Sequence, residues 1–519
     1  MASTFFGVSI AKSGLTAAQA ALITTSNNVS NVKTTGYSRQ VVTQVAAGAA
    51  AVYNGSGIIG GGSEVTSIER ERNWRLDQSY WSQNTVQTTW QTKSDTMSQI
   101  ESVFGEPSDN GFTTVMKNFH DALENLSKAS PDPSVRTTVE SYGESFCQYL
   151  HDAAATLQAQ REGINQDVKT SVDQINSYAK QLADLNQTIS QAKASGSPAN
   201  ELQDQRDLLL DKLSAVAGIT VTKTVQPGGD ENNPTWSVSI GSETLVNGSY
   251  YDTINCTASA DNMFTLQWEK TGAAFVSSGG SLGSQLELRD GTGTGGTYQG
   301  IPYYQAQLDD FARTFARSFN EGSITSNTSQ SGGHATGYGA DGSTGLCFFT
   351  SSTDNSTAAF RAIASNLIDP NAFDKQYATI TAANISVSSD IKSNVSKIAA
   401  ATANPTTTSG ESDNNNAKAL ADLLQSTNCM GTGKGTPEDA INAIVTTMGT
   451  NSAYAKRMAT NLSSAVATIS SRRSSVSGVS TNEEASNLTM YQQAYESSAK
   501  VLTTWDDIYT TTLDLLNGD

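Results

Sequence analysis

The chain has 519 residues, which is enough for about two to four domains. Hydrophobic residues make up 37% and charged residues only 16%, so much of the polar surface must come from uncharged side chains. The formal net charge is -18 and the sequence pI is about 4.6, so a phosphate backbone would repel the chain, which argues against nucleic acid as a partner.

The cysteines are scattered along the chain and form no C-x-x-C pair. They are Cys147, Cys256, Cys347 and Cys429. This spacing favours small buried residues over a zinc or redox site. Residues 1–7 have neither a basic region nor a long apolar stretch, so no cleaved secretory signal peptide is expected. No run of about 18 apolar residues is found, and no membrane span is predicted.

Both chain ends carry an apolar stripe at alternating spacings of three and four, a pattern typical of a helix packed against another helix. The N-terminal stripe comprises Val8, Ala11, Leu15, Ala18, Leu22, Thr25, Val29 and Val32. The C-terminal stripe comprises Leu488, Tyr491, Tyr495, Leu502, Trp505, Tyr509 and Leu516. The first helix is expected to stop by Gly36. The second is expected to begin near Asn482, capped by that side chain ahead of Glu483 and Glu484.

The sequence predicts a helical middle part. A helix is expected over about 73–104, and residues 111–215 form the most helical stretch. Within it, a heptad pattern runs over 164–189, breaks at 195–198 and resumes over 202–216. Two long helices around such a Gly-Pro break indicate an antiparallel helical hairpin.

From residue 218 to about 289 the hydrophobic period changes to two. Alternation in 219–225, 236–240 and 264–268 predicts half-buried strands, and Asn247-Gly248 supplies a turn. Further helices are expected near 303–319, 417–425 and 437–474.

The chain therefore divides into four predicted regions, and its two ends must meet if they share a core. The regions are a terminal helical assembly domain (1–45 plus 475–519), a mainly helical domain (46–218 plus 301–345 plus 411–474), a β-rich region (219–300) and an outer mixed or β insertion (346–410).

No residue pattern points to catalysis, so no catalytic, cofactor-binding or metal-ligating residues are predicted. The three histidines lack H-E-x-x-H or H-x-H spacing. His120 is expected on a helix, at its surface or packed, and His334 in a solvated glycine-rich loop. The glycine-rich stretches lack the phosphate-loop motif, and the pairs Asp309-Asp310 and Asp506-Asp507 are adjacent on helices rather than facing across a cleft.

Short motifs at both ends carry a family resemblance. At the N-terminal end they are S-G-L-T-A-A-Q-A-A-L from Ser13, S-N-N-V-S-N from Ser26 and T-G-Y-S-R-Q from Thr35. At the C-terminal end they are V-S-G-V-S from Val476, Glu483-Glu484, Asn487-Leu488 and Y-Q-Q-A-Y from Tyr491. Together they resemble the terminal signatures of the flagellar axial family, which comprises rod, hook and hook-associated proteins.

Inner segments narrow the resemblance. They are Y-A-K-Q-L-A-D-L-N-Q-T-I from Tyr178, N-E-L-Q-D-Q-R-D-L-L-L-D-K-L-S from Asn200, L-D-D-F-A-R-T-F from Leu308 and the stretch 342–349 ending in Phe348-Phe349. These segments resemble the hook-associated proteins at the hook–filament junction, and the similarity covers most of the chain except 225–300 and 350–410. Gln203 departs from the pattern, because the family more often has leucine there, and it is expected to soften a local contact.

The resemblance implies an α+β, multidomain fold: a terminal α-helical coiled coil from both chain ends, a helical-bundle middle domain and an inserted β-rich outer domain. It implies a structural subunit, not an enzyme, that joins hook to filament. The implied partners are further copies in a tubular assembly, the hook protein, a second junction protein, a cap protein above it and an export chaperone. The implied location is extracellular, in the bacterial flagellum, reached by type III export without a cleaved signal peptide.

Assembly is predicted to depend on the paired terminal helices. The expected interface residues are Val8, Leu15, Leu22 and Val29, facing Leu488, Tyr495, Leu502 and Tyr509. An isolated alanine-rich helix is marginal in water, so ordering the ends on assembly would discourage premature polymerisation. The stripes alone do not separate this arrangement from an ordinary monomeric bundle.

Three other functions stay open. Hook protein and flagellin share the terminal motifs, although the segment 200–214 argues against both. A surface adhesin with flagellar ends would need a recognition surface in 219–300, whose deletion would abolish adhesion and spare motility. An inserted enzyme is the third alternative, weakened by the missing metal motif.

Overall fold

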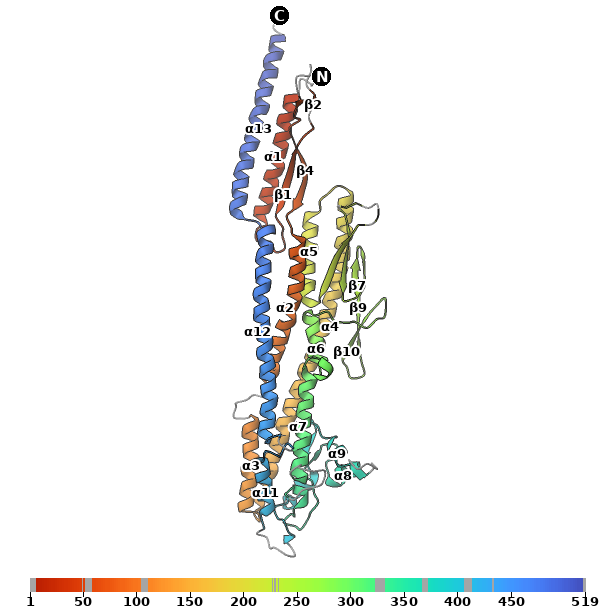
Figure 1. The fold of residues 1–519 in the computed structure, drawn as a ribbon, viewed down its shortest axis with the longest axis vertical. Helices are drawn as coiled ribbons and strands as arrows, with labels where there is room; N and C mark the ends of the chain where they lie inside the picture. Colours follow the sequence, from red (N-terminus) through yellow and green to blue (C-terminus); the bar gives the residue numbers. More distant parts are fainter. Residues whose placement is uncertain are drawn as a thin grey trace.

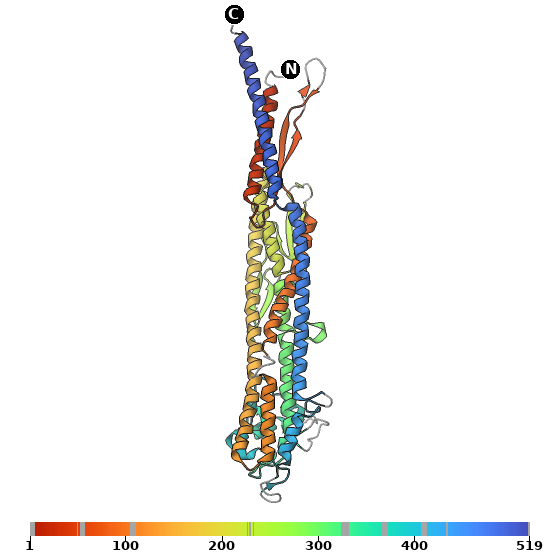
Figure 2. The same cartoon turned by 90° about the vertical axis from the view of Figure 1, so that its left-hand side faces the viewer.

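The protein is a long, mostly helical rod with both termini at one end (Figures 1 and 2). The computed structural model describes residues 6–48, 50–51, 58–103, 111–225, 227, 230–231, 233–322, 332–365, 372–405, 413–431 and 434–516. Small sheets accompany the helices, which agrees with an α+β fold.

The terminal part consists of two helices and a long β-hairpin. Helix α1 spans Phe6–Ser30 and packs against α13, Thr481–Leu516. Strand β1, Gln40–Ala46, pairs antiparallel with β4, Ser63–Arg70, and both lie against α1. The short strands β2 and β3, Ala50–Ala51 and Ile58–Ile59, extend this hairpin. The prediction placed most of this hairpin in the helical domain and did not recognise its strands.

Helix α13 begins at Thr481, one residue before the expected start, and the predicted cap is wrong. The Oγ of Ser480 accepts a hydrogen bond from the N–H of Glu483 at 3.4 Å, whereas Asn482 lies inside the helix. The serine side chain accepts from one of the free N–H groups of the first turn. A polar side chain therefore caps the helix as expected, but the residue is Ser480 instead of Asn482.

The long helices α2, α4 and α12 form much of the body of the rod. Helix α2, Trp74–Glu101, begins at the cap residue Asn73 and packs along α12, Pro437–Ser477. This confirms the helix expected over about 73–104, whose last residue Phe104 lies outside the described residues. Helix α4, Pro133–Ala194, is 62 residues long and runs almost the whole length of the body (Figure 2).

The predicted helical hairpin is confirmed. Helix α4 turns at 195–199 into α5, Asn200–Val216, and the two helices pack side by side. Ala199 closes the turn in the left-handed region with φ of 52°, which a non-glycine residue adopts at some cost. Helix α3, Phe112–Lys128, packs against the other end of α4.

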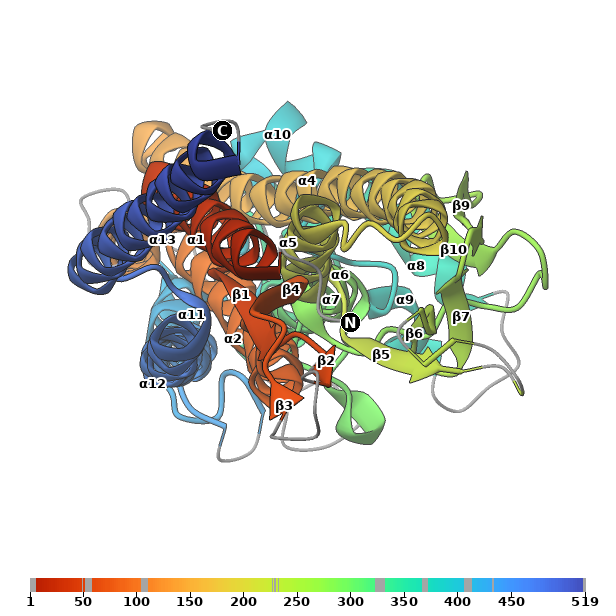
Figure 3. The ribbon, with the colours of Figure 1, turned by 90° about the horizontal axis from the view of Figure 1, so that it is seen from above.

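The strands predicted in the middle of the chain are also present. Strands β5 to β8 form one antiparallel sheet in that order, and β9 pairs with β10. Their bounds are Ile219–Thr224 (β5), Thr235–Ile240 (β6), Glu243–Asn247 (β7), Tyr250–Tyr251 (β8), Ile254–Ala258 (β9) and Phe264–Trp268 (β10). Seen down the long axis, β7, β9 and β10 lie on the opposite side of the rod from α12 (Figure 3).

The remaining elements run from the middle of the rod, where α6 packs against α2, α4 and α5, to the end away from the termini (Figure 1). They are α6 (Gly280–Asp290), η1 (Thr294–Gly296), α7 (Ile301–Glu321), η2 (His334–Thr336), β11 (Phe349–Ser351), α8 (Thr357–Ser365), α9 (Ala372–Tyr377), β12 (Ile385–Val387), α10 (Ser389–Ser393), η3 (Val395–Lys397) and α11 (Asn415–Leu424). Helix α6 lies within the region predicted to be β-rich.

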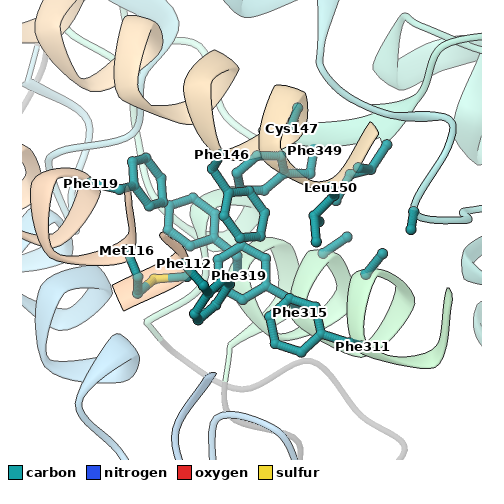
Figure 4. Close-up of a cluster of buried hydrophobic side chains, with 14 of the residues drawn as sticks. Phe112, Met116, Phe119, Phe146, Cys147, Leu150, Phe311, Phe315, Phe319 and Phe349 are labelled. Carbon is teal, nitrogen blue, oxygen red and sulfur yellow. The ribbon is translucent and has the colours of Figure 1, made fainter. Parts of the chain in front are cut away.

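Two hydrophobic cores follow one another along the rod. The core farther from the termini, here the distal core, contains stacked and edge-on phenylalanines from α3, α4, α7 and β11 (Figure 4). The rings of Phe146 and Phe315 lie 4.5 Å apart between centroids. The proximal core joins the sheet β5–β8 and β10 to α4, α5 and α6, so the β-rich segment shares its core with the helices. Because α4 contributes to both cores, the boundaries of the four predicted regions stay predictions.

Candidate assembly site

The two terminal helices run antiparallel and touch where small residues let them approach. A methyl group added at Gly7 would lie 2.3 Å from the ring of Trp505, and one added at Gly14 would lie 3.0 Å from the Oγ of Ser498. The next positions at this spacing are Ala21 and Asn28. Asn28 donates to the carboxylate of Glu484 at 3.2 Å. These contacts are spaced in sevens on both helices, so they define one continuous seam.

The eight predicted interface residues do not make these contacts. Val8, Leu15, Leu22 and Val29 each follow a seam position by one residue, which turns them by about 100° around α1. On α13, Leu502 and Tyr509 are half-buried, whereas Leu488 and Tyr495 are exposed. The structure thus brings the two helices together as expected, and the interface role of the eight residues stays a prediction.

The other side of α1 packs on the β-hairpin. The buried side chains of α1, on either face, are short: Ala11, Ala17, Ala18, Ala21, Thr24 and Thr25, together with Asn28. The N–H of Ser63 donates to the Oγ of Ser13 at 3.1 Å, which holds β4 against the helix. Small side chains on both faces explain how α1 fits between α13 and the hairpin.

Helix α1 also passes a simple test for a membrane helix. Among the described residues it is the one helix long and apolar enough to cross a membrane, with a mean hydropathy of 1.2 over 18 residues. The prediction of no span, which required an unbroken apolar run, did not detect this. Core helices of soluble proteins pass the same test, and α1 packs against α13, β1 and β4.

A buried polar cluster joins this terminal part to the body. Asn28 exchanges two hydrogen bonds with the backbone of Gln40, at 2.9 and 3.0 Å, and accepts a third from the hydroxyl of Tyr37. The Nε of Arg39 donates to Glu484 at 2.7 Å, and Glu484 is 1% exposed. Burial and the carboxylate of Glu201 raise the pKa of Tyr37 to about 12, so its hydroxyl stays a donor at neutral pH.

The cluster continues onto α5. Asp204 accepts from the backbone N–H and the hydroxyl of Ser38 at 3.0 and 2.6 Å, and from Arg70 at 2.6 Å. Arg70 also reaches Asp207 at 2.9 Å. Although burial acts against it, Arg70 and Arg206 hold the pKa of Asp207 below its usual value, so this buried carboxylate is ionised at neutral pH.

A third set of ion pairs ties in α2 and α12. Arg473 of α12 contacts Asp77 at 3.0 Å and Asp211 at 3.1 Å. Asp77 also pairs with Arg72 at 2.6 Å, and Asp211 accepts from the indole of Trp81 at 2.7 Å. Together these sets form what we call the neck network: Asn28, Tyr37, Ser38, Arg39, Gln40, Arg70, Arg72, Asp77, Asp204, Asp207, Asp211, Arg473 and Glu484.

The motifs that carried the family resemblance meet in this network. T-G-Y-S-R-Q supplies Tyr37 to Gln40, the Glu483-Glu484 motif supplies Glu484, and the segment from Asn200 supplies Asp204 and Asp207. Gln203, expected to soften a contact, instead accepts from Arg70 at 3.2 Å. In the sequence analysis these polar residues counted only as part of the family motifs, and the interface was assigned to apolar residues. The signal that could have predicted the network was the presence of charged and polar residues in motifs from distant parts of the chain.

The described residues hold no arrangement typical of a reaction centre. No group of three or more His, Cys, Asp or Glu side chains there could hold a metal ion. Cys147, Cys347 and Cys429 are buried free thiols, as predicted, whereas Cys256 is half-buried. Burial raises the pKa of Cys347 to about 11 and that of Cys429 to about 12, so neither is a thiolate at neutral pH.

The prediction for His334 is wrong. Its side chain is buried rather than solvated, and both ring nitrogens are bonded, Nδ1 to the carbonyl of Leu346 at 2.8 Å and Nε2 to the N–H of Ala399 at 3.0 Å. Burial lowers the pKa of His334 to about 4. Nε2 accepts, so the ring is neutral and serves as a structural bridge between two loops. His120 is partly exposed on α3, as expected.

Three family models match the chain. The model of the flagellar hook-associated protein FlgK helical domain matches residues 97–349. The flagellar basal body rod FlgEFG protein C-terminal model matches residues 471–515, and the flagella basal body rod protein model matches residues 9–37. The last two matches fall on α13 and α1, the two partners of the terminal pair.

Curated relatives extend the match over nearly the whole chain. Flagellar hook-associated protein 1 of Bacillus subtilis is 28% identical, over 98% of this chain and 97% of the relative. The protein of the same name from Escherichia coli is 29% identical, over 96% of this chain and 97% of the relative. A solved structure, the flagellar hook junction protein FlgK from Burkholderia pseudomallei, shares the fold with a TM-score of 0.60 at 18% identity, covering 77% of this chain and all of that one.

A rod-shaped chain with paired terminal helices, each matched by a flagellar rod model, is a structural protein of the flagellar axis. Within that class, the match to the FlgK helical-domain model and the relatives matched over nearly their whole length support a structural hook-associated junction protein similar to flagellar hook-associated protein 1.

Proposed function

We propose that the chain joins the hook to the filament as a subunit of a tubular assembly, in which copies pack through the α1–α13 pair. The observation that supports this most is the exposure of α13. Among its described side chains only Glu484 is buried, although the helix carries many apolar residues. The exposed ones are Leu488, Met490, Tyr495, Val501, Ile508, Leu513 and Leu515. A soluble monomer rarely leaves so long an apolar surface in water, and neighbouring copies would cover it.

The predicted partners and location follow from this proposal. Further copies would form the tube, the hook protein would contact one end, and a second junction protein the other. An export chaperone would cover the terminal helices before assembly, and the chain would leave the cell by type III export without a cleaved signal peptide. Val8, Leu15, Leu22, Val29, Leu488, Tyr495, Leu502 and Tyr509 remain candidate contacts in this assembly.

The adhesin alternative loses support from the proximal core. Val221, Val238 and Trp268 of the β-rich region pack in the same core as Leu210 and Leu213 of α5. Deleting residues 219–300 would therefore open that core rather than remove a separable binding module.

The substitution Leu502→Asp tests the assembly role. Leu502 is half-buried on α13, and a carboxylate there would weaken packing along the helix. We expect a strain carrying this variant to lose motility and to secrete unassembled filament protein. The control is Val276→Asp, which introduces the same carboxylate at a residue that is 73% exposed in the segment between β10 and α6, and which should leave motility intact. Normal flagella with Leu502→Asp would contradict the proposal.

A further inference from the structure

A pocket of about 410 Å³ lies beside the neck network, between the end of α4 and the sheet that follows α5. It is lined among others by Asn186, Lys193, Arg206, Asn233, Trp236 and Tyr250. The end of α4 and the sheet β5–β8, which supply much of this lining, lie below the terminal helices and the β-hairpin β1–β4 in Figure 1. None of the functions argued above uses this pocket.

Arg206 is the unusual group in its wall. The side chain is 3% exposed, and its guanidinium stacks on the ring of Trp236 at 3.4 Å. Its Nε lies 3.7 Å from Asp207, an ion pair too long for a hydrogen bond. Among the described residues, neither Nε nor Nη2 has a hydrogen-bond partner. A buried guanidinium with unused donors is costly, and an acceptor supplied by an occupant would relieve that cost.

Cationic side chains gather around Arg206 in a strongly acidic chain, although Asp207 and Asp230 lie among them. Burial and then the charge of Arg206 lower the pKa of Lys193, which also lines the pocket. Burial and Arg206 likewise lower the pKa of Lys223, on the neighbouring strand β5, to about 8. Asp207 also faces Arg70 and Arg72, so it is not a dedicated partner of Arg206. Such a field favours an anion in the pocket.

A second buried group points to an occupant that also carries a donor. Asn186 is 9% exposed and donates through Nδ2 to the carbonyl of Gly248 at 3.0 Å. Its Oδ1 has no partner among the described residues. A carboxylate attached to a peptide brings both an acceptor for the guanidinium and N–H groups for Asn186.

We propose that this pocket is a binding site for a carboxylate, held by Arg206 and Lys193. The carboxylate comes either from a small organic acid in solution or from an Asp or Glu side chain of an adjoining subunit. The pocket itself does not depend on the proposed function; only the adjoining-subunit source rests on it. Arg206 presents a planar fork that suits a carboxylate, with Lys193 as a second positive charge.

Titration of the purified chain with succinate at constant ionic strength tests the site. The readout is the ¹⁹F resonance of Trp236 in protein labelled with 5-fluorotryptophan, assigned with Trp236→Phe. We expect a saturable shift of this resonance, and Lys193→Gln should weaken the apparent affinity about tenfold. The matched control Lys212→Gln, at an exposed lysine of α5, should leave it unchanged. Circular dichroism verifies that each variant is folded.

The absence of a saturable response to succinate in the wild-type chain would overturn the proposal, as would an equal loss of affinity in both lysine variants. The source of the carboxylate is decided with Ser249→Cys, at an exposed position on the pocket rim, by maleimide labelling of free chain and intact flagella. Protection in flagella identifies an adjoining subunit, whereas equal labelling identifies a small acid. The unsubstituted chain corrects for labelling of Cys256.

Discussion

Single residues of the neck network decide how firmly the terminal helices are held. Glu484 receives hydrogen bonds from Arg39 and Asn28, which belong to the loop before β1 and to α1. Its neighbour Glu483 is 65% exposed at the side chain and lies 4.0 Å from Arg39. Two adjacent carboxylates on one helix therefore differ in burial and in bonding, which offers a matched comparison.

Glu484→Gln is expected to lower the free energy of unfolding of the terminal part by about 2 kcal/mol, because it removes a charge-assisted hydrogen bond in a buried setting. Glu483→Gln should change it by less than about 0.5 kcal/mol, since exposed ion pairs contribute little. Hydrogen exchange of amides in α1 and α13 measures both effects. Equal protection in the two variants would show that the network does not hold the helices.

His334 adds a pH dependence to the distal core. Its pKa falls from 6.5 to about 4 on burial, so above pH 6.5 both folded and unfolded forms are neutral and the bridge contributes fully. Between pH 6.5 and 4 the unfolded chain binds a proton that the folded chain does not, and stability falls as pH falls, by about 3 kcal/mol over this window. Chemical denaturation at several pH values measures the free energy of unfolding. In His334→Gln, the loss of stability between pH 6.5 and 4 should be smaller by about 3 kcal/mol. An unchanged slope in the variant would contradict it.

These residue-scale features set the limit of prediction from sequence. His334 follows two glycines, a context typical of an exposed loop, and only the folding of 332–346 against the distal core buries it. Gln203 was expected to weaken a contact because leucine is usual there, but a polar partner, Arg70, reaches it from β4. In both cases the deciding partner is distant in sequence.

At the scale of elements, helix α4 connects the two cores and carries two glycines in different settings. Gly143 is buried, and a methyl group there would lie 2.8 Å from the ring of Phe348. Gly163 is exposed, with no other atom within 4 Å of such a methyl group. It lies just before Ile164, the last α4 residue of the distal core.

Gly163→Ala is expected to raise the free energy of unfolding by about 0.5–1 kcal/mol, because alanine restricts the unfolded chain and favours the helix. Gly143→Ala should lower it by about 1–3 kcal/mol, since the added methyl group overpacks the core against Phe348. Urea denaturation measures both. A stabilising effect at Gly143 would show that the distal core is less tightly packed than the structure indicates.

The elements themselves were largely predictable where a single period ran long enough. Heptad spacing predicted the second half of α4, α5 and the terminal helices, and alternation predicted β5, β6 and β10. The hairpin β1–β4 was missed because its strands alternate weakly and lie within a polar stretch, so only pairing with each other and with α1 makes them strands. Where α1 and α13 approach, glycines, a serine and an asparagine lie at heptad-spaced positions, a pattern that a search for apolar stripes does not detect.

At the scale of the whole molecule, the chain leaves the terminal part, folds two successive cores and returns along α12 to the same end (Figure 1). The neck network lies where these segments of the chain converge, and it links α1, α2, α5, α12 and α13. A rod anchored at one end through its paired termini can place a long body against its neighbours while the ends build a continuous tube. This arrangement suits a junction between two different tubes.

Immunogold electron microscopy of intact flagella, with an antibody against this chain, tests the junction role most directly. The account predicts a narrow band of label between hook and filament, because a junction subunit occupies only that level of the axis. Label spread along the hook or along the filament would contradict it and would make the chain a major axial subunit instead.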